Sequence, residues 1–242
     1  MLGVAGEIAA GKGTATSLVK EWYSGTPSVR FSDSLREFLV DFNNMKSTAI
    51  FAMVPGHMLL EHYLREVLPK IFSEEVITQR GEEGVHEFAF WLDKEWFISP
   101  EPVKEDRHNL QALSTAVRSI FAENIIERTV VARIARMETK SPVAIIEGIR
   151  RLVDIGTLLS EPNFRLVYIE IDPEIAFGRM KARNENVGDG EMTRERFMEL
   201  REAEAEQEIR LLKPHAHLVI DNSGPPDTLQ FVLQSEVLKW IA

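Results

Sequence analysis

Short apolar runs alternate with longer segments of helical periodicity along most of the chain. Met1–Ala5 is an apolar run that leads into a glycine-rich turn, so it predicts a buried parallel strand. The other predicted strands are Ser28–Phe31, Val143–Ile146, Phe164–Ile171 and His217–Ile220. The helices predicted between and after the strands are Lys12–Tyr23, Ser34–Phe42, Val153–Leu159, Asp172–Arg183 and Thr228–Trp240.

Two regions of the chain show helical periodicity without strands between the helices. From about Asn43 to Arg107 the pattern predicts helices and no strand, and we interpret this region as a helical insertion. A long helical pattern runs from about Asn109 to Met137, with at most a weak interruption. Near the end, Thr193 is a suitable N-cap for a single, highly charged helix that continues to about Leu212.

The alternation of strands and helices predicts an α/β fold, with a mostly parallel sheet and helices on both faces. The 242 residues suit one such domain with an insertion or a small lid. We therefore assign residues 1–42 and 108–242 to the core, with a lid at about 184–195. Residues 43–107 form the insertion, which either binds the second substrate or makes a homodimer interface.

The composition is that of an ordinary globular chain, with 44% hydrophobic and 27% charged residues. Cysteine is absent, which excludes disulfides and thiolate metal sites and fits a reducing cytoplasm, where we expect the protein to act. No run reaches the roughly 18 to 20 apolar residues of a membrane helix. The N-terminus lacks the basic start and apolar stretch of a signal peptide. We expect neither a membrane partner nor an export signal.

The formal net charge is −10, which disfavours binding to DNA or RNA because phosphate is repelled over the whole surface. A nucleic-acid end kinase is therefore a poor fit to this chain. A small anionic substrate requires only a local cluster of positive groups, so the positions of the arginines are more informative than their number.

The strongest motif is Gly6-x4-Gly11-Lys12, which follows a predicted strand and opens a predicted helix. Glycine lets the backbone wrap closely around phosphate oxygens, and successive amides then form an anion-binding nest. The helix start adds free N–H groups and a positive dipole end, while Lys12 supplies a charge for the terminal phosphates. The candidate nucleotide-binding residues of the loop are Gly6, Ala9, Ala10, Gly11, Lys12, Gly13 and Thr14.

The residue directly after Lys12 is Gly13, where the strict motif has a Ser or Thr whose hydroxyl ligates Mg²⁺. Thr14 comes one position later and is a candidate Mg²⁺ ligand. The alternative is an ion held by phosphates and water, which suits the reluctance of Mg²⁺ to dehydrate.

Two further clusters follow predicted strands, at the edge of the sheet where ligands bind in parallel α/β folds. After the second strand, Asp33 is a candidate for orienting or deprotonating an acceptor, and Arg36 for binding its phosphate. A helix N-cap with a solvated arginine explains this pair equally well. After the central strand, Glu147 is a candidate for Mg²⁺ through water, and Arg150 for phosphate. A strand-ending turn is the alternative there.

Arg179 and Arg183 are four residues apart, so they share one face of a predicted helix. A polar loop from Asn184 to Gly190 follows, and an arginine beside such a loop can stabilise the charge that develops in phosphoryl transfer. Arg196 and Arg201 are better explained by salt bridges on their glutamate-rich helix. Asn222 follows the last strand, where it is either a contact to a base or part of a plain turn.

These motifs, taken in order, resemble the nucleotide-kinase branch of the P-loop kinases, which includes adenylate kinases, dephospho-CoA kinases and deoxynucleoside monophosphate kinases. The resemblance lies in Val4–Thr14, Phe31–Glu37, Leu110–Asn124, Ile145–Arg151, Arg179–Arg183 and His217–Gly224. It implies the P-loop NTPase fold, with a five-stranded parallel sheet in the order 2-3-1-4-5. The insertion at 43–107 is larger than the usual acceptor-binding insert, which leaves the acceptor open.

The resemblance also implies a magnesium- and ATP-dependent transfer of the γ-phosphate to a nucleotide or nucleotide-like acceptor. Lys12 then neutralises phosphates, Asp33 or Arg36 addresses the acceptor, Arg179 covers the adenine side and Arg183 stabilises the transferred group. A regulatory protein that senses ATP without transferring phosphate is the alternative from another class.

Overall fold

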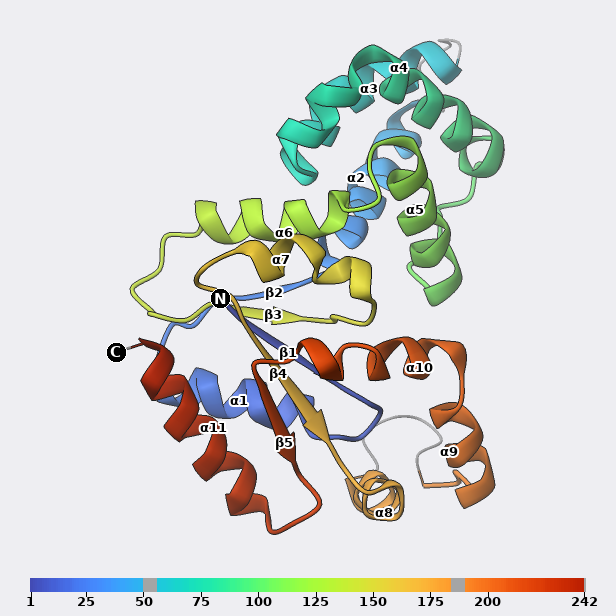
Figure 1. The fold of residues 1–242 in the computed structure, drawn as a ribbon. Coiled ribbons are helices and arrows are strands. Elements are labelled where there is room, and N and C mark those ends of the chain that lie inside the picture. Colours follow the sequence, from blue (N-terminus) through green and yellow to red (C-terminus); the bar gives the residue numbers. More distant parts are fainter. Residues whose placement is uncertain (50–55, 184–189, 242) are drawn as a thin grey trace. The chain divides into compact units, whose positions relative to one another are not determined.

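The computed structural model describes residues 1–49, 56–183 and 190–241. The chain divides into two compact units (Figure 1). The sheet unit comprises Met1–Val29 and Met137–Ala242, and the helical unit comprises Arg30–Arg136. The helical unit extends beyond the insertion predicted at 43–107 at both ends.

The sheet has five strands in the order β2-β3-β1-β4-β5, which confirms the predicted topology. β1 pairs in parallel with β3 and β4, and β4 pairs in parallel with β5. The register places Val4 opposite Val167, and Ile169 opposite Ile220. The strands are β1 Leu2–Gly6, β2 Ser28–Arg30, β3 Ile145–Glu147, β4 Arg165–Glu170 and β5 Leu218–Asp221.

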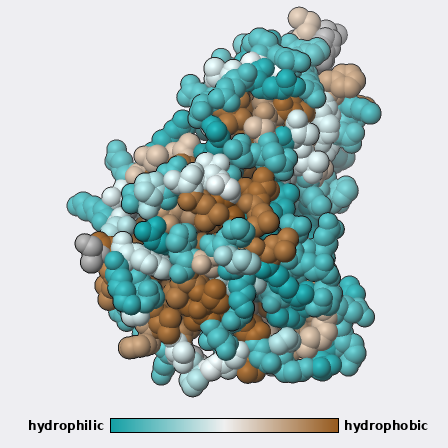
Figure 2. All heavy atoms as spheres, in the orientation of Figure 1, coloured by the Kyte–Doolittle hydropathy of each residue, from teal (hydrophilic) through white to brown (hydrophobic). Residues whose placement is uncertain are grey.

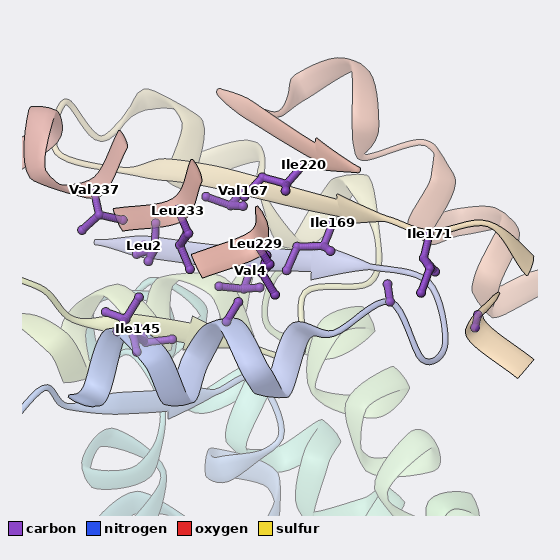
Figure 3. Close-up of a cluster of buried hydrophobic side chains, with 14 of the residues drawn as sticks. Leu2, Val4, Ile145, Val167, Ile169, Ile171, Ile220, Leu229, Leu233 and Val237 are labelled. Carbon is purple, nitrogen blue, oxygen red and sulfur yellow. The ribbon is translucent and has the colours of Figure 1, made fainter. Parts of the chain in front are cut away.

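One face of the sheet is covered by α1 (Lys12–Trp22) and α11 (Pro226–Ile241), as Figures 1 and 3 show. Alternate residues of β1 and β4 point toward these helices because side chains alternate along a strand. The resulting core includes Leu2, Val4, Val167, Ile169, Ile220, Leu229, Leu233 and Val237. On the other face, a Cβ at Gly3 would lie 2.7 Å from Ile149, so the backbone there is packed closely.

The remaining helices of the sheet unit connect the strands or follow them. They are η2 Leu152–Asp154, α7 Gly156–Ser160, α8 Pro173–Arg183, α9 Arg194–Arg201, α10 Glu204–Arg210 and η3 Lys213–His215. None of the helices among the described residues combines the length and the apolar run that crossing a bilayer requires. Hydrophilic residues cover much of the face seen in Figure 2.

The prediction of a single helix from Thr193 to Leu212 was wrong. Thr193 does cap the first part, since its hydroxyl accepts a hydrogen bond from the amide of Arg196 at 3.2 Å. The helix then ends at Arg201 and α10 begins at Glu204. The carbonyl of Arg201 accepts a hydrogen bond from Nη2 of Arg210 at 2.8 Å, so a side chain takes the place of an intrahelical amide at the break.

The helical unit contains α2 Asp33–Ala49, α3 Gly56–Ile71, α4 Glu74–Leu92, η1 Asp93–Phe97, α5 Arg107–Ile120 and α6 Ile125–Arg136. Its interior is aromatic, with Phe38 centred 5.4 Å from Phe88, and Phe88 centred 5.7 Å from Phe121. Ring pairs at these separations add to the burial energy.

The helical pattern from Asn109 to Met137, expected to have at most a weak interruption, is divided into two helices, because α5 ends at Ile120 and α6 begins at Ile125. The side chain of Arg80 donates to the carbonyl of Ile120 at 2.7 Å, and Arg118 donates to the carbonyl of Glu123 at 2.5 Å. Both carbonyls are thus satisfied outside a continuous helix. The carbonyl of Asn124 accepts the first bond of α6, the N-cap position at which asparagine is favoured.

Replacing Phe88 with alanine is expected to destabilise the helical unit by about 3–5 kcal/mol, because a fully buried ring leaves a cavity. Phe90, two residues away on the same helix, is 65% exposed, so Phe90→Ala is the matched control. Urea unfolding monitored by tryptophan fluorescence measures both variants. Equal losses of stability would contradict the burial of Phe88.

Candidate phosphate-binding site

The turn between β1 and α1 has the backbone conformation of a phosphate-binding loop. Gly6, Ala9 and Gly11 all have positive φ angles, of 149°, 60° and 103°. A Cβ on Gly6 would lie 2.3 Å from the carbonyl oxygen of Ile169, and one on Gly11 would lie 2.5 Å from Nδ2 of Asn222. Both glycines of the motif are therefore required by conformation and by space.

The helix after the loop presents free amides. The first intrahelical hydrogen bond runs from the amide of Ala15 to the carbonyl of Gly11, at 3.0 Å. The amides of Lys12, Gly13 and Thr14 precede it, so they have no acceptor within the helix. Together with the helix dipole they form a site that attracts anions.

Lys12 is folded back onto its own loop. Its Nζ donates to the carbonyls of Gly6 and Glu7, at 2.7 and 2.8 Å. Burial lowers the pKa of Lys12 to about 8; the nearby charge of Glu206 opposes this effect and that of Arg150 adds to it. The charge of Lys12 is therefore poorly solvated. An anion bound in the loop would raise the pKa of Lys12 back toward its usual value.

A buried carboxylate anchors the loop to the helices that follow the predicted lid. Glu7 is only 8% exposed, and it forms ion pairs with Nη2 of Arg201 at 2.8 Å and Nε of Arg210 at 2.7 Å. We call these three residues the Glu7 clamp. The adjacent ring of Tyr168 is buried, which together with the charge of Glu7 raises the pKa of its hydroxyl to about 12.

The Glu7 clamp was missed from the sequence. A salt bridge for Arg201 was expected on its own helix, but its partner lies in the loop, 194 residues earlier. The expectation holds for Arg196, which pairs with Glu199 at 2.8 Å. One feature of the sequence could have indicated the clamp. Glu7 directly follows the first motif glycine, and a charge that is buried at this position needs a partner.

A second carboxylate, that of Glu206, reaches the loop from α10. Its Oε2 accepts a hydrogen bond of 2.7 Å from the amide of Ile8. Glu206 is half-buried, and its charge acts on Lys12. One amide of the loop thus already holds an anionic oxygen that belongs to the protein itself.

Asn222 and Arg179 tie the last strand to the loop. The side-chain amide of Asn222 is buried and donates to the carbonyl of Ala10 at 2.9 Å. Arg179 donates to the carbonyls of Asn222 and Gly224, at 2.7 and 2.8 Å. Both side chains therefore have structural partners, and Asn222 contacts the loop directly. Contact with a base stays a prediction.

Glu147 lies at the end of β3, near the sheet edge that carries the loop. Its carboxylate accepts hydrogen bonds from the hydroxyl of Ser28 and from Nζ of Lys20, the latter at 3.3 Å. Gly148 follows with a φ angle of 81°. The amide of Arg150 donates to Asp154 at 3.1 Å, and its charge is close enough to Lys12 to act on it.

The remaining predicted site residues are Asp33, Arg36, Arg183 and Thr14. Asp33 and Arg36 belong to the helical unit, where Asp33 accepts from the amide of Arg30 at 2.7 Å and Arg36 pairs with Glu105. Arg183 ends α8 and is exposed, as is Thr14. Residues 184–189 of the predicted lid lie outside the described part of the chain.

Within the described ranges, the structure gathers no group of three or more histidine or acidic side chains suited to a metal. The Nδ1 atom of His217 accepts a hydrogen bond from the amide of Leu166 at 3.0 Å. Burial lowers its pKa, which favours this neutral, accepting form. The roles of Thr14 and Glu147 toward Mg²⁺ stay predictions.

The sheet order and the loop geometry define the class: the chain has the fold of a P-loop NTPase. No family model matches it. A UPF0200 protein of Thermococcus gammatolerans (strain DSM 15229 / JCM 11827 / EJ3) is 28% identical over 80 residues, which is 32% of this chain and 42% of that protein. The match thus spans less than half the length of this relative.

Two solved structures are similar over nearly the whole chain. TT1252 from Thermus thermophilus is 18% identical with a TM-score of 0.45, over 98% of this chain and 96% of that one. A dephospho-CoA kinase from Campylobacter jejuni is 13% identical with a TM-score of 0.42, over 99% and 96%. Likenesses of this size say nothing about activity, and the fold follows from the sheet order and the loop.

Proposed function

We propose that the chain is an ATP-dependent kinase that transfers a phosphoryl group to a nucleotide or nucleotide-like acceptor. The observation that carries this proposal is the loop, which combines three amides without helical acceptors, two space-restricted glycines and the poorly solvated charge of Lys12. This donor set suits a polyphosphate, whose charge is spread over many oxygens. It fits the triphosphate of Mg·ATP.

The residues of the sheet unit supply positioning and charge. Lys12 would exchange its two loop carbonyls for phosphate oxygens, and the amides of the first helical turn would hold the adjacent phosphates. Glu147 would hold water of the Mg²⁺ shell, and the ion would neutralise charge on the phosphates. Arg150, which already acts on Lys12, would add a second cation near the transferred group.

The acceptor side is proposed on the sequence pattern alone. Asp33 would orient or deprotonate the acceptor hydroxyl, Arg36 would bind its phosphate and Arg183 would stabilise the transferred group. Arg36 would first have to leave its ion pair with Glu105. Exposed pairs of this kind contribute at most about 1 kcal/mol, so an acceptor phosphate competes with them easily.

A coupled ADP-release assay tests the proposal, with nucleoside monophosphates, deoxynucleoside monophosphates and dephospho-CoA as acceptors. We expect one class of acceptor to stimulate ADP release at least tenfold over the rate with water alone. Arg36→Ala should raise the KM for that acceptor, while Arg196→Ala serves as the control. If Mg·ATP binds but no acceptor stimulates release, an ATP-sensing protein becomes the better explanation.

A further inference from the structure

Two acidic side chains lie at the loop, Glu7 within it and Glu206 from α10, and they differ in how firmly they are held. Glu7 is buried and has two arginine partners in the Glu7 clamp. Glu206 is half-buried, and the hydrogen bond the structure gives its carboxylate runs from the amide of Ile8. Glu7 is therefore a fixed part of the loop, whereas Glu206 is able to leave it at much lower cost.

The position of Glu206 is one that an anionic ligand needs. The amide of Ile8 belongs to the same loop as the free amides at the start of α1, and the carboxylate acts electrostatically on Lys12. A phosphate oxygen and a carboxylate oxygen cannot share one amide. Two anions beside the same lysine also repel each other.

We propose that Glu206 occupies the phosphate-binding loop while it is empty of nucleotide, and that the incoming polyphosphate must displace it. In the empty loop the carboxylate of Glu206 accepts the hydrogen bond of the Ile8 amide and places a negative charge near Lys12. Displacement frees α10 at Glu206, while the Glu7 clamp continues to hold the same helix through Arg210. Binding of phosphate is thereby coupled to the contact between α10 and the loop.

The inference rests on the proposed function only in requiring that the loop binds polyphosphate. Calorimetry with tripolyphosphate and with Mg·ATP therefore tests it without any phosphoryl transfer. Glu206→Gln and Glu206→Ala are expected to tighten binding of both ligands roughly tenfold, since a charge-assisted hydrogen bond no longer has to be broken. Glu204→Gln is the matched control, because it removes the same charge from an exposed position on the same helix.

Hydrogen exchange at the Ile8 amide gives an independent readout in the ligand-free protein. Exchange should become faster in Glu206→Ala, and tripolyphosphate should restore protection. If the wild type binds polyphosphate and Glu206→Gln binds it equally well or more weakly, the inference is overturned. The proposed function then still stands. Binding by Glu206→Gln but not by the wild type would support it strongly. If no protein bound either ligand, both would fall.

Discussion

Lys12→Ala is expected to weaken binding of Mg·ATP by about 100-fold while the protein stays folded. Each charge-assisted contact to a phosphate contributes about 1.5–3 kcal/mol, and about 1.4 kcal/mol corresponds to a factor of ten. The fold should tolerate the change because burial disfavours the charge of Lys12 in the free protein, as its lowered pKa indicates. Calorimetry measures the affinity, and circular dichroism checks the fold.

The pH dependence provides a second readout of the same side chain. Lys12 has a pKa of about 8 in the free protein, so it is charged below that pH and becomes neutral as the pH rises through it. A bound phosphate raises the pKa again, which means that affinity should begin to fall at about pH 8 in the wild type only. Lys239→Ala, on the surface of α11, is the control. A binding curve of Lys12→Ala that matches the wild type at every pH would refute the assignment.

The sheet and the loop were predictable because both depend on local patterns. Apolar runs such as Val143–Ile146 are short and bounded by turn residues, and buried parallel strands have this signature. The loop follows from two glycines and a lysine at fixed spacing, because only that spacing brings amides around a phosphate. In the structure, a Cβ on either glycine would clash with a backbone or side-chain atom.

The breaks in the two long helices were not predictable, since neither contains glycine or proline at the break. Each carbonyl at a break is satisfied by an arginine from elsewhere: Arg80 at Ile120 and Arg210 at Arg201. Such partners are set by tertiary packing and leave no periodic trace. For the same reason the sequence did not indicate which arginines pair with Glu7, or that Glu206 contacts Ile8.

The predictions for Asp33 and Arg36 are a third case, because they depend on the helical unit as well as on the sheet unit. Asp33 and Arg36 were chosen because residues after parallel strands face one edge of the sheet. They belong to the helical unit, and their local partners are Arg30 and Glu105. A measurement showing that an acceptor binds Arg36 in solution would therefore connect the helical unit functionally with the loop.

Gly6→Ala is expected to lower the free energy of unfolding by at least about 2 kcal/mol, the second large effect. Its φ angle of 149° is unfavourable for an L side chain, and the new Cβ would lie 2.3 Å from the carbonyl oxygen of Ile169. That oxygen belongs to β4, the strand paired with β1, so the clash cannot be relieved by a change of rotamer. Loss of stability and loss of loop shape should therefore appear together.

Gly13→Ala is the matched control within the same motif. A Cβ on Gly13 would meet nothing within 4 Å, and the residue lies in the first turn of α1. Alanine there should be neutral or stabilising by up to about 1 kcal/mol, because it reduces the conformational freedom of the unfolded chain and favours the helix. Urea unfolding of both variants decides the matter. Equal stability of Gly6→Ala and Gly13→Ala would mean that the loop does not approach β4 closely in solution. The loop geometry on which phosphate binding depends would then be absent as well.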